Sequence, residues 1–554
     1  NLTESDVMVD SPTNNFATWN ALSYDGGTAM TEGNLNAYGS GGTSANEGGT
    51  ATIGVTSGKW YWENRIKAVG SSCAIGIFPS NNNPKAIADM FQGNPSIYYK
   101  QDGNKHVNDS SSSYGSSYTT GDIIGVALNL DDNEIKFYKN NTVQNSGTAI
   151  AVTSTSEYYN PVQAGTGSSQ VTANFGSDSS FAGAATAQGN QDGNDIGDFY
   201  YTPPTGFLAL CTSNLPDVAV VPSEHFNTVA YTLSGGSYPK SVTGVGFQPD
   251  LIWQKSRTQN YGHYLFDVIR GVGTASLASN STGAEGADSG TDLDSFDADG
   301  FTVGGGDAIG DTSGVVWNWK ANGSGSSNTD GSINTTKTSA NVDAGFSMVT
   351  YTGNVTEGAT VGHGLSKAPE LMFVKRRNVA GGWMTYSAAT GATKTFTLNT
   401  TEAAYTSAGI WNNTAPTADV FSLGSNGATN ANGGTYLAYC FHSVDGYSKV
   451  GSYTGNGNAD GTFVYTGFRP AFVIVKRTDV AKQWKIEDNK RLGYNPKNYD
   501  LYADSTEVEN SIEQIDFTSN GFKLRATATS CNASGGTYIY IAFAETPFKY
   551  SNAR

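Results

Sequence analysis

Short apolar runs bounded by glycine and proline recur along the chain, and one of them occurs three times. The copies lie at 246–255, 368–376 and 467–477, and in each a Lys follows six positions after a Pro: Lys255 after Pro249, Lys375 after Pro369, and Lys476 after Pro470. Apolar runs of this length with β-branched and aromatic residues predict buried strands. Proline is tolerated at the start of such a strand, where its missing N–H costs the ladder little.

Other aromatic landmarks keep nearly the same spacing as this run. The equivalent triplets are Tyr231, Tyr351 and Tyr453; His263, Trp383 and Trp484; Phe301, Phe421 and Phe522; and Trp319, Phe441 and Phe543. A period of about 100 residues is too long for one turn of a solenoid. The sequence therefore predicts three copies of one small domain, with Trp253, Phe373 and Ile474 at equivalent buried positions.

The region before the repeats contains three further strand patterns. Residues 121–140 predict two strands joined by a tight polar turn, and residues 58–66 alternate apolar and polar positions as a strand does. The third pattern is the run Asn174-Phe175-Gly176 after a short apolar segment. In this order, the three patterns resemble the SPRY domain over about residues 10–185, which implies a concanavalin-like β-sandwich.

We therefore expect an all-β protein with a SPRY-like sandwich at 1–217 and three tandem β-sandwich repeats at 218–328, 329–445 and 446–554. The 68 glycines and the 12% aromatic content agree with many short strands and turns. Residues 321–329 are rich in Gly, Ser and Asn, which predicts a flexible linker between the first two repeats.

The net charge of −17 makes a nucleic-acid role unfavourable, because phosphate backbones repel an acidic surface. No apolar run is long enough for a membrane span. The four cysteines are far apart and form no Cys-x-x-Cys motif, so we expect lone buried thiols and no disulfide framework. The chain begins at Asn1 without Met, and we expect that a segment upstream was removed.

The search for chemistry gives no catalytic residue, cofactor or metal site. The five histidines are dispersed, and His263 stands where the other repeats have Trp, which favours core packing. Asp292, Asp294, Asp297 and Asp299 precede Gly300 but lack the Glu of a calcium loop, so a tight turn is the preferred interpretation. In the first region Glu63 has no partner carboxylate in the pattern that a glycosidase requires.

Four tyrosines in the first region are the candidate ligand-binding residues. Tyr98, Tyr99, Tyr114 and Tyr118 lie in a stretch rich in Ser, Asn and Gly. An exposed aromatic ring can stack on the apolar face of a sugar. We therefore expect exposed rings here that bind a glycan, and the alternative is that some of these tyrosines cover the edge of the sandwich.

A SPRY-like unit followed by such repeats resembles virion structural proteins of marine tailed bacteriophages, and residues 7–16 and 547–554 are similar in style. This resemblance implies a non-enzymatic tail fibre or surface appendage at the virion surface. Its partners would be other virion proteins and a host cell-surface glycan or receptor, and it would form a homo-oligomer such as a trimer. The alternatives are an architectural head-decoration or assembly protein and a carbohydrate depolymerase.

Overall fold

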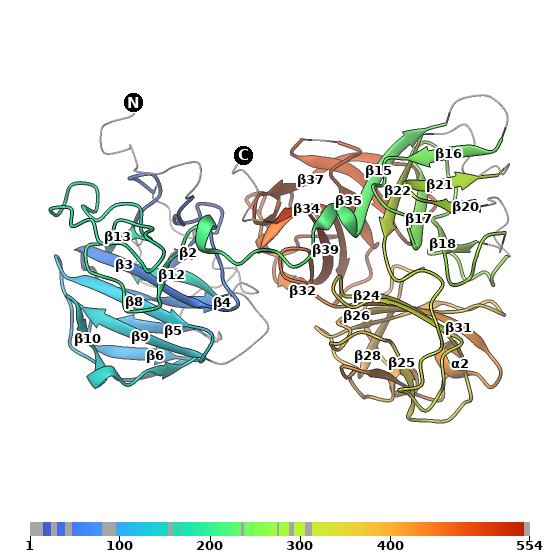
Figure 1. The fold of residues 1–554 in the computed structure, drawn as a ribbon, viewed down its shortest axis with the longest axis horizontal. Coiled ribbons are helices and arrows are strands. Elements are labelled where there is room, and N and C mark those ends of the chain that lie inside the picture. The colour runs from blue at the N-terminus through green and yellow to red at the C-terminus, as the bar shows by residue number, and fades with distance from the viewer. Residues whose placement is uncertain are drawn as a thin grey trace. The chain divides into compact units, whose positions relative to one another are not determined.

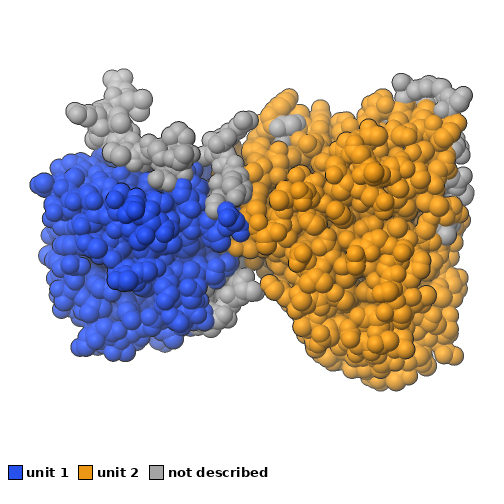
Figure 2. All heavy atoms as spheres, viewed as in Figure 1, with its two compact units in different colours: residues 1–217, 462–467, 548–550 blue, residues 218–461, 468–547, 551–554 orange. Residues whose placement is uncertain are grey.

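The computed structural model describes residues 15–23, 30–38, 47–79, 96–152, 159–166, 168–233, 238–273, 276–286, 293–304, 313–492 and 494–547. These residues belong to two compact units (Figure 2). The first unit comprises residues 1–217 with 462–467 and 548–550, and the second comprises most of residues 218–547. The terminal segments 1–14 and 548–554, which carry most of the resemblance to virion proteins at the chain ends, lie outside the described residues.

The first unit contains two antiparallel sheets (Figure 1). One sheet has the order β1 (Asn36–Tyr38), β13 (Gln170–Asn174), β3 (Lys59–Ala68), β8 (Ile123–Asn129), β9 (Glu134–Lys139) and β10 (Thr142–Val143). In this sheet β11 (Ile150–Ala151) also pairs with β9, and β14 (Leu208–Ala209) pairs in parallel with β3. The other has the order β2 (Glu47–Thr50), β12 (Tyr159–Thr166), β4 (Ser72–Pro79), β5 (Ile97–Lys100), β6 (Asn104–Val107) and β7 (Ser110–Ser113).

The strands predicted in the first unit are present. β3 and β13 lie next to each other, and β8 and β9 form the predicted hairpin with Asn129 opposite Glu134. Trp62, Ile75 and Phe137 are fully buried in one large core cluster of this unit. The core forms because alternate side chains of each strand point to one face of its sheet.

The second unit contains three consecutive sheets built from the repeats. The first repeat has the order β15 (Phe226–Thr232), β22 (Ser313–Trp319), β17 (Leu251–Ser256), β18 (Tyr264–Asp267) and β19 (Leu277–Ala278). The second has β23 (Lys337–Asn341), β24 (Phe346–Thr352), β31 (Thr435–Phe441), β26 (Leu371–Arg376), β27 (Trp383–Ser387), β28 (Lys394–Thr397) and β29 (Tyr405–Thr406). The third has β32 (Ser448–Thr454), β39 (Thr537–Pro547), β34 (Phe468–Arg477), β35 (Lys485–Asp488), β36 (Lys497–Tyr502), β37 (Asn510–Thr518) and β38 (Gly521–Leu524).

Short elements complete the repeats. The first repeat adds a small sheet of β16 (Lys240–Thr243), β21 (Gly300–Val303) and β20 (Leu293–Asp297), and the second adds β25 (Ala359–Gly362) paired with β30 (Val420–Leu423). The short strand β33 (Phe463–Tyr465) falls in the part of the chain grouped with the first unit. The α-helices among the described residues are α1 (Ala408–Trp411) and α2 (Gly427–Asn430), so the all-β prediction is confirmed.

The three repeats have the same strand topology. In each sheet the last strand lies between the first long strand and the strand that carries the recurring apolar run. The predicted equivalent residues occupy matching register positions, with Trp253 opposite Trp317, Phe373 opposite Tyr439, and Ile474 opposite Ile541. Their exposed fractions are 4%, 3% and 3%, which confirms that the three positions are equivalent and buried.

The repeats share one core, which the sequence did not indicate. The largest core cluster of the second unit contains buried residues of all three repeats. Trp319 and Phe441, which end β22 and β31, and Phe543 on β39 meet within this cluster. Their ring centroids are 6.4 Å apart for Trp319 and Phe441, 5.6 Å for Trp319 and Phe543, and 6.1 Å for Phe441 and Phe543. The side of each sheet that faces this cluster is therefore buried only when the other two repeats are present.

Buried lysines close the three repeats into a ring. The Lys of each recurring run donates to a backbone carbonyl of a neighbouring repeat: Lys375 to Thr282 (3.0 Å), Lys476 to Thr401 (2.9 Å) and Lys255 to Thr506 (3.3 Å). Burial lowers the pKa of Lys255 and that of Lys476 to about 8. Since each repeat donates to one neighbour and accepts from the other, the contact has approximate threefold symmetry.

Charged side chains reinforce the contact between the first and second repeats. Glu285 binds Arg377 of the second repeat at 2.8 Å and Arg270 of its own repeat at 3.2 Å. Arg270 also binds Asp267 at 2.6 Å, and the Tyr439 hydroxyl of the second repeat donates to Asp267 at 2.8 Å. The buried charges are thus paired and hydrogen-bonded, as burial in a medium of low dielectric requires.

The same arrangement recurs between the third and first repeats. Glu509 binds Arg257 of the first repeat at 2.9 Å and Arg491 of its own repeat at 3.2 Å. Arg491 binds Asp488 at 2.6 Å, and Trp317 Nε1 of the first repeat donates to Asp488 at 3.1 Å. This contact joins the third repeat to the first and completes the ring.

The contact between the second and third repeats lacks this ion network. The positions that correspond to the network residues of the other two contacts are occupied by Ser387, Thr390, Ala404, Thr478 and Ile541. A backbone hydrogen bond joins the two repeats here, because the N–H of Ala404 donates to the carbonyl of Thr478 at 2.9 Å. All members of the charged network are therefore replaced together, so no charge is left buried without a partner.

The prediction of a flexible linker at 321–329 is wrong. Ala321 is buried, and its N–H donates to the Asp250 carboxylate at 2.7 Å, while Gly323 N–H donates to the same carboxylate at 3.3 Å. The N–H of Asn322 donates to the Ser339 hydroxyl. Composition predicts the flexibility of an isolated segment, whereas here a buried carboxylate fixes the backbone.

Candidate functional site

The four candidate tyrosines lie in the interior of the first unit. The exposed fractions of Tyr98 and Tyr99 are 0%, and those of Tyr114 and Tyr118 are 5% and 4%. The rings of Tyr99 and Tyr118 make an edge contact with centroids 5.2 Å apart, and Tyr114 packs against Tyr99 and Phe137. The expectation of exposed rings was wrong. Tyr99, Tyr114 and Tyr118 fill the sandwich core, and Tyr98 is buried in a separate small cluster with Phe78, so their faces are unavailable for stacking on a sugar.

The hydroxyl groups of Tyr99 and Tyr118 hold the loop at residues 114–122. The Tyr99 hydroxyl donates to the backbone carbonyl of Ser116, and the Tyr118 hydroxyl donates to the carbonyls of Cys73 (2.9 Å) and Tyr99 (3.0 Å). The Gln144 side-chain oxygen accepts from Ser116 N–H at 2.9 Å. Burial raises the pKa of Tyr118 well above its usual value, so this hydroxyl stays protonated and remains a donor.

The outer side of this loop is rich in exposed hydroxyl groups. Its exposed residues with hydroxyls are Ser116, Ser117, Thr119 and Thr120, and the edge strand β7 adds Ser110, Ser111, Ser112 and Ser113. Lys139 Nζ donates to the Ser117 carbonyl at 2.8 Å and pairs with Asp122 at 3.2 Å. We call residues 116–120 the hydroxyl loop. It combines a fixed backbone with polar side chains that face solvent.

Glu63, the carboxylate considered above for a glycosidase site, is buried in the first unit. Its carboxylate accepts from the backbone N–H groups of Tyr200 (2.8 Å) and Tyr201 (2.7 Å), and from the side chains of Tyr61 and Asn174. Burial raises the pKa of Glu63 to about 7 against the effect of these donors. All four donors are neutral protein groups, so the arrangement anchors the segment around residue 200 to the sandwich.

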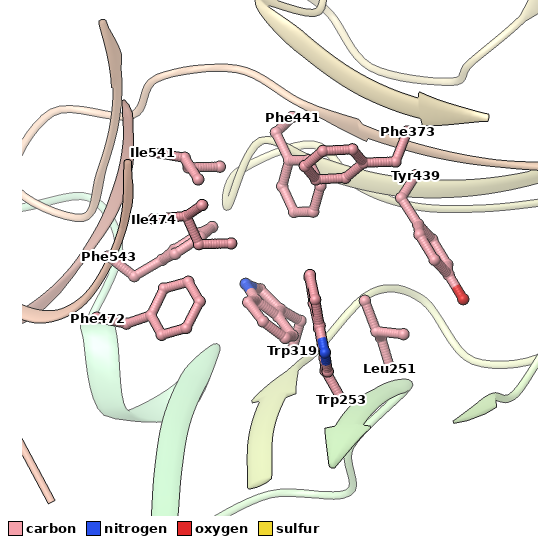
Figure 3. A pocket seen from close by; sticks show the side chains of 10 residues that line it. All are labelled: Leu251, Trp253, Trp319, Phe373, Tyr439, Phe441, Phe472, Ile474, Ile541 and Phe543. Atoms are coloured by element: carbon pink, nitrogen blue, oxygen red, sulfur yellow. The ribbon is translucent and has the colours of Figure 1, made fainter. Parts of the chain in front are cut away.

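A small cavity lies on the axis of the three-repeat ring. Figure 3 shows its ten lining residues: Leu251, Trp253, Trp319, Phe373, Tyr439, Phe441, Phe472, Ile474, Ile541 and Phe543. Its volume is about 10 Å³, roughly that needed to hold one water molecule. Because the lining is apolar, a water molecule would find no hydrogen-bond partners there. The cavity is a packing gap where three bulky sets of side chains meet.

His263 belongs to this core, as predicted. Trp253 Nε1 donates to His263 Nδ1 at 3.1 Å, and the imidazole stacks on Trp317 with an interplanar angle of 11°. Burial lowers the pKa of His263 well below 6.5, so the ring is neutral. In the second repeat Trp383 stacks on Tyr439 in the same way.

The acidic turn of the first repeat uses its carboxylates for internal hydrogen bonds. Asp297 accepts from the hydroxyls of Ser295 (2.6 Å) and Thr302 (2.7 Å). Asp299 accepts from the N–H groups of Gly244 (3.2 Å) and Gly246 (2.6 Å). Asp292 lies outside the described residues. Within the described part of the chain, no group of three or more His, Cys, Asp or Glu side chains is arranged to hold a metal ion.

The cysteines and the helices add no further site. Cys73, Cys211, Cys440 and Cys531 are all free and buried, as the sequence predicts. Burial raises the pKa of Cys531 to about 11, which keeps its thiol protonated. No helix in the described part of the chain has the length and apolar character needed to cross a bilayer.

Comparison with known proteins identifies both units. The first contains a SPRY domain, since the SPRY family model matches residues 59–178, within the region that the sequence pattern indicated. The second unit matches the model described as "Domain of unknown function (DUF7483)" over residues 221–547, which is more than half of the chain. The chain therefore belongs to the DUF7483 family.

Several solved structures are similar to part of the chain. The SPRY domain of human HERC1 is 19% identical, and the match covers 25% of this chain and 87% of that one with a TM-score of 0.21. A human SPRY domain is 18% identical, with 25% and 90% covered and a TM-score of 0.20. The PSpry domain of TRIM65 is 14% identical, with 29% and 93% covered and a TM-score of 0.23. No curated protein matches the chain.

Proposed function

We propose that this chain is a non-enzymatic structural protein of the phage virion surface, a tail fibre or similar appendage, and that its SPRY unit recognises a host surface glycan. The observation that carries the recognition role is the hydroxyl loop. Its backbone is held from below by the buried Tyr99, Tyr118 and Gln144. The phage context is supported by the resemblance in sequence organisation described above.

A fixed polar loop suits recognition of a sugar. Exposed Ser and Thr hydroxyls can donate and accept hydrogen bonds, and sugar hydroxyls do the same. Because the backbone is already held in place, binding loses little conformational entropy. Loops presented by a rigid sandwich can also change in sequence without loss of the sheet. The buried tyrosines thus act as supports of the recognition surface.

The three-repeat unit supplies a rigid body in this proposal. Its repeats share a core and are joined by hydrogen bonds in a closed ring. Such a unit resists partial opening, because separation of one repeat exposes apolar surface on the other two. We infer that this unit is the part that packs against other virion proteins.

A glycan array tests the recognition role with the full-length chain. A single sugar site binds weakly, so the chain is tetramerised on streptavidin to raise the effective concentration. We expect the tetramer to bind specific bacterial surface glycans and the variant Ser116→Ala/Ser117→Ala to lose most of this signal. The matched control Ser57→Ala/Thr205→Ala removes two exposed hydroxyls elsewhere in the first unit and should bind as the wild type does.

The result that overturns the recognition role is equal binding by both variants, or no binding by the tetramer to any glycan of the array. The architectural alternative would then be favoured. Release of shorter saccharides from a bound polysaccharide would instead support the depolymerase alternative.

A further inference from the structure

The interior of the third repeat contains a charged triad that is fully enclosed. Lys485 and Glu487 lie on β35, and Asp500 lies on the paired strand β36. Their exposed fractions are 1%, 2% and 0%. The three side chains lie on the face of the sheet opposite to Ile486 and Leu501, which belong to the shared core.

The contacts within this triad are unusual for an ion pair. Lys485 Nζ touches Asp500 Oδ2 directly and lies 3.6 Å from Glu487 Oε1. Among the described residues, Lys485 Nζ, Glu487 Oε1 and Asp500 Oδ1 have no conventional hydrogen-bond partner although they are buried. Buried charges are normally surrounded by additional hydrogen bonds that offset the loss of water. Here the Tyr502 hydroxyl donates to Asp500 Oδ2 at 3.4 Å, while the three atoms named above are left without such a bond.

The other two repeats have neutral side chains at the same places. The strand register aligns Lys485, Glu487 and Asp500 with Tyr264, Phe266 and Ser276 in the first repeat and with Met384, Tyr386 and Thr395 in the second. The fold therefore does not require charge at these positions. The third repeat carries three ionisable groups where its two relatives within the chain pack without any.

We propose that Lys485 and Asp500 are joined by an intramolecular amide bond between their side chains, and that Glu487 is the acid–base group for its formation. An amide replaces an ammonium group and a carboxylate by one neutral group, which removes the cost of burying both charges. Direct contact of the amine nitrogen with the carboxyl group is the geometry that such a reaction requires.

The reaction is a balanced condensation. In the neutral form of the pair, the Lys485 amine attacks Cγ of the protonated Asp500 carboxyl group and forms a tetrahedral intermediate. The protonated Glu487 delivers its proton to the departing hydroxyl and takes one from the nitrogen, so that a C–N bond forms, a C–O bond breaks and one water molecule leaves. No oxidant, reductant or cofactor is consumed.

The environment of Glu487 fits this role. Burial and the adjacent Asp500 raise the pKa of Glu487 well above its usual range, which favours the protonated form of its carboxyl group. A proton-bearing acid beside the carboxyl that reacts can polarise it and assist the leaving group. The Cys531 thiol is nearby, and burial keeps it protonated, so it does not compete as a nucleophile.

Intact-mass measurement of the full-length wild-type chain, with all thiols reduced, tests the proposal. We expect a mass lower than that of the sequence by one water molecule. Tryptic digestion should yield a branched peptide that joins the segment containing Lys485 to the segment containing Asp500. Lys485→Arg and Glu487→Gln should each restore the mass of the sequence and abolish the branched peptide.

Lys523→Arg is the matched control, because Lys523 is also buried and pairs with Asp460 at 2.8 Å. This variant should keep the mass deficit and the branched peptide. A wild-type mass equal to that of the sequence would overturn the proposal. A deficit that persists in Lys485→Arg, or that occurs without the branched peptide, would overturn it as well. The wild-type measurement decides the question even where a variant fails to fold.

Discussion

The indole of Trp319 packs edge-on against the ring of Phe543, with centroids 5.6 Å apart and an interplanar angle of 75°. Trp319 ends β22 of the first repeat, Phe543 lies on β39 of the third, and Phe441 of the second repeat completes the group. One side chain from each repeat thus meets at the axis of the ring. The stability of the second unit is therefore a property of all three repeats together.

Truncation of Phe373 tests the shared core. Phe373 is 3% exposed and contacts both Phe441 of its own repeat and Trp484 of the third. We expect Phe373→Ala to lower the free energy of unfolding by about 3–5 kcal/mol, because a buried ring leaves a cavity. Denaturant unfolding of the full chain measures this loss. Val379→Ala, at an exposed position, should change it by less than about 0.5 kcal/mol; similar values for both variants would contradict the account.

The sequence predicted this architecture in part. The spacing of Trp319, Phe441 and Phe543 established the repeats and the register of their strands, because a buried strand has a short apolar run that is visible in one dimension. That the three residues touch one another was not predictable. Contact between repeats depends on which face of each sheet is left uncovered, and strands buried on both faces show no alternation that would mark this face.

The buried ion networks predict that the free energy of unfolding depends strongly on the pairing of each buried charge. In Arg491→Ala, Asp488 would lose its charged partner at 2.6 Å while it remains buried. We expect a loss of about 3–5 kcal/mol in the free energy of unfolding. Arg469→Ala breaks a more exposed pair with Glu545 and should cost less than about 1 kcal/mol. Equal losses in chemical denaturation would show that the ring does not depend on its buried pairs.

The buried carboxyl group of Glu63 predicts that the stability of the first unit depends on pH. Burial raises its pKa from 4.5 to about 7, so the folded state binds the proton more tightly than the unfolded chain. The resulting stabilisation is complete below the unfolded pKa and is lost as the pH rises through about 7. The variant Glu63→Gln does not titrate at this position. The stability of the wild type relative to this variant should therefore fall by roughly 3 kcal/mol across this range.

Unfolding of both proteins in denaturant at a series of pH values measures this difference. A difference that stays constant, or that grows as the pH rises, would contradict the assigned environment of Glu63.

Removal of the Tyr118 hydroxyl tests the support of the hydroxyl loop. Tyr118→Phe keeps the ring in the core but leaves the carbonyls of Cys73 and Tyr99 without this donor. We expect a loss of about 1–3 kcal/mol and faster hydrogen exchange at residues 116–120. Thr142→Ala, at an exposed position nearby, is the control. Unchanged exchange in the Tyr118 variant would show that the loop is held by other groups.

The tyrosines also show where the sequence interpretation failed. Tyr98, Tyr99, Tyr114 and Tyr118 stand among polar residues, and local composition alone favours exposure. Their burial follows from pairing of β5 with β4 and β6 and from the return of the loop over the sheet. The hydroxyl loop was missed because exposed Ser and Thr residues have no distinctive spacing.

Treatment with a chelator should leave the melting temperature of the chain unchanged. Asp297 and Asp299 already accept hydrogen bonds from Ser295, Thr302 and two backbone N–H groups within their turn. Thermal unfolding with and without EDTA measures the effect. A clear drop that added calcium reverses would show that the acidic turn binds an ion.

A three-dimensional reconstruction of the particle that carries this chain tests the proposed function most directly. The account predicts the chain on the outer surface, with the hydroxyl loop at residues 116–120 facing the medium and the three-repeat unit against other virion proteins. Density that places the hydroxyl loop in contact with virion subunits, or the chain inside the particle, would contradict it.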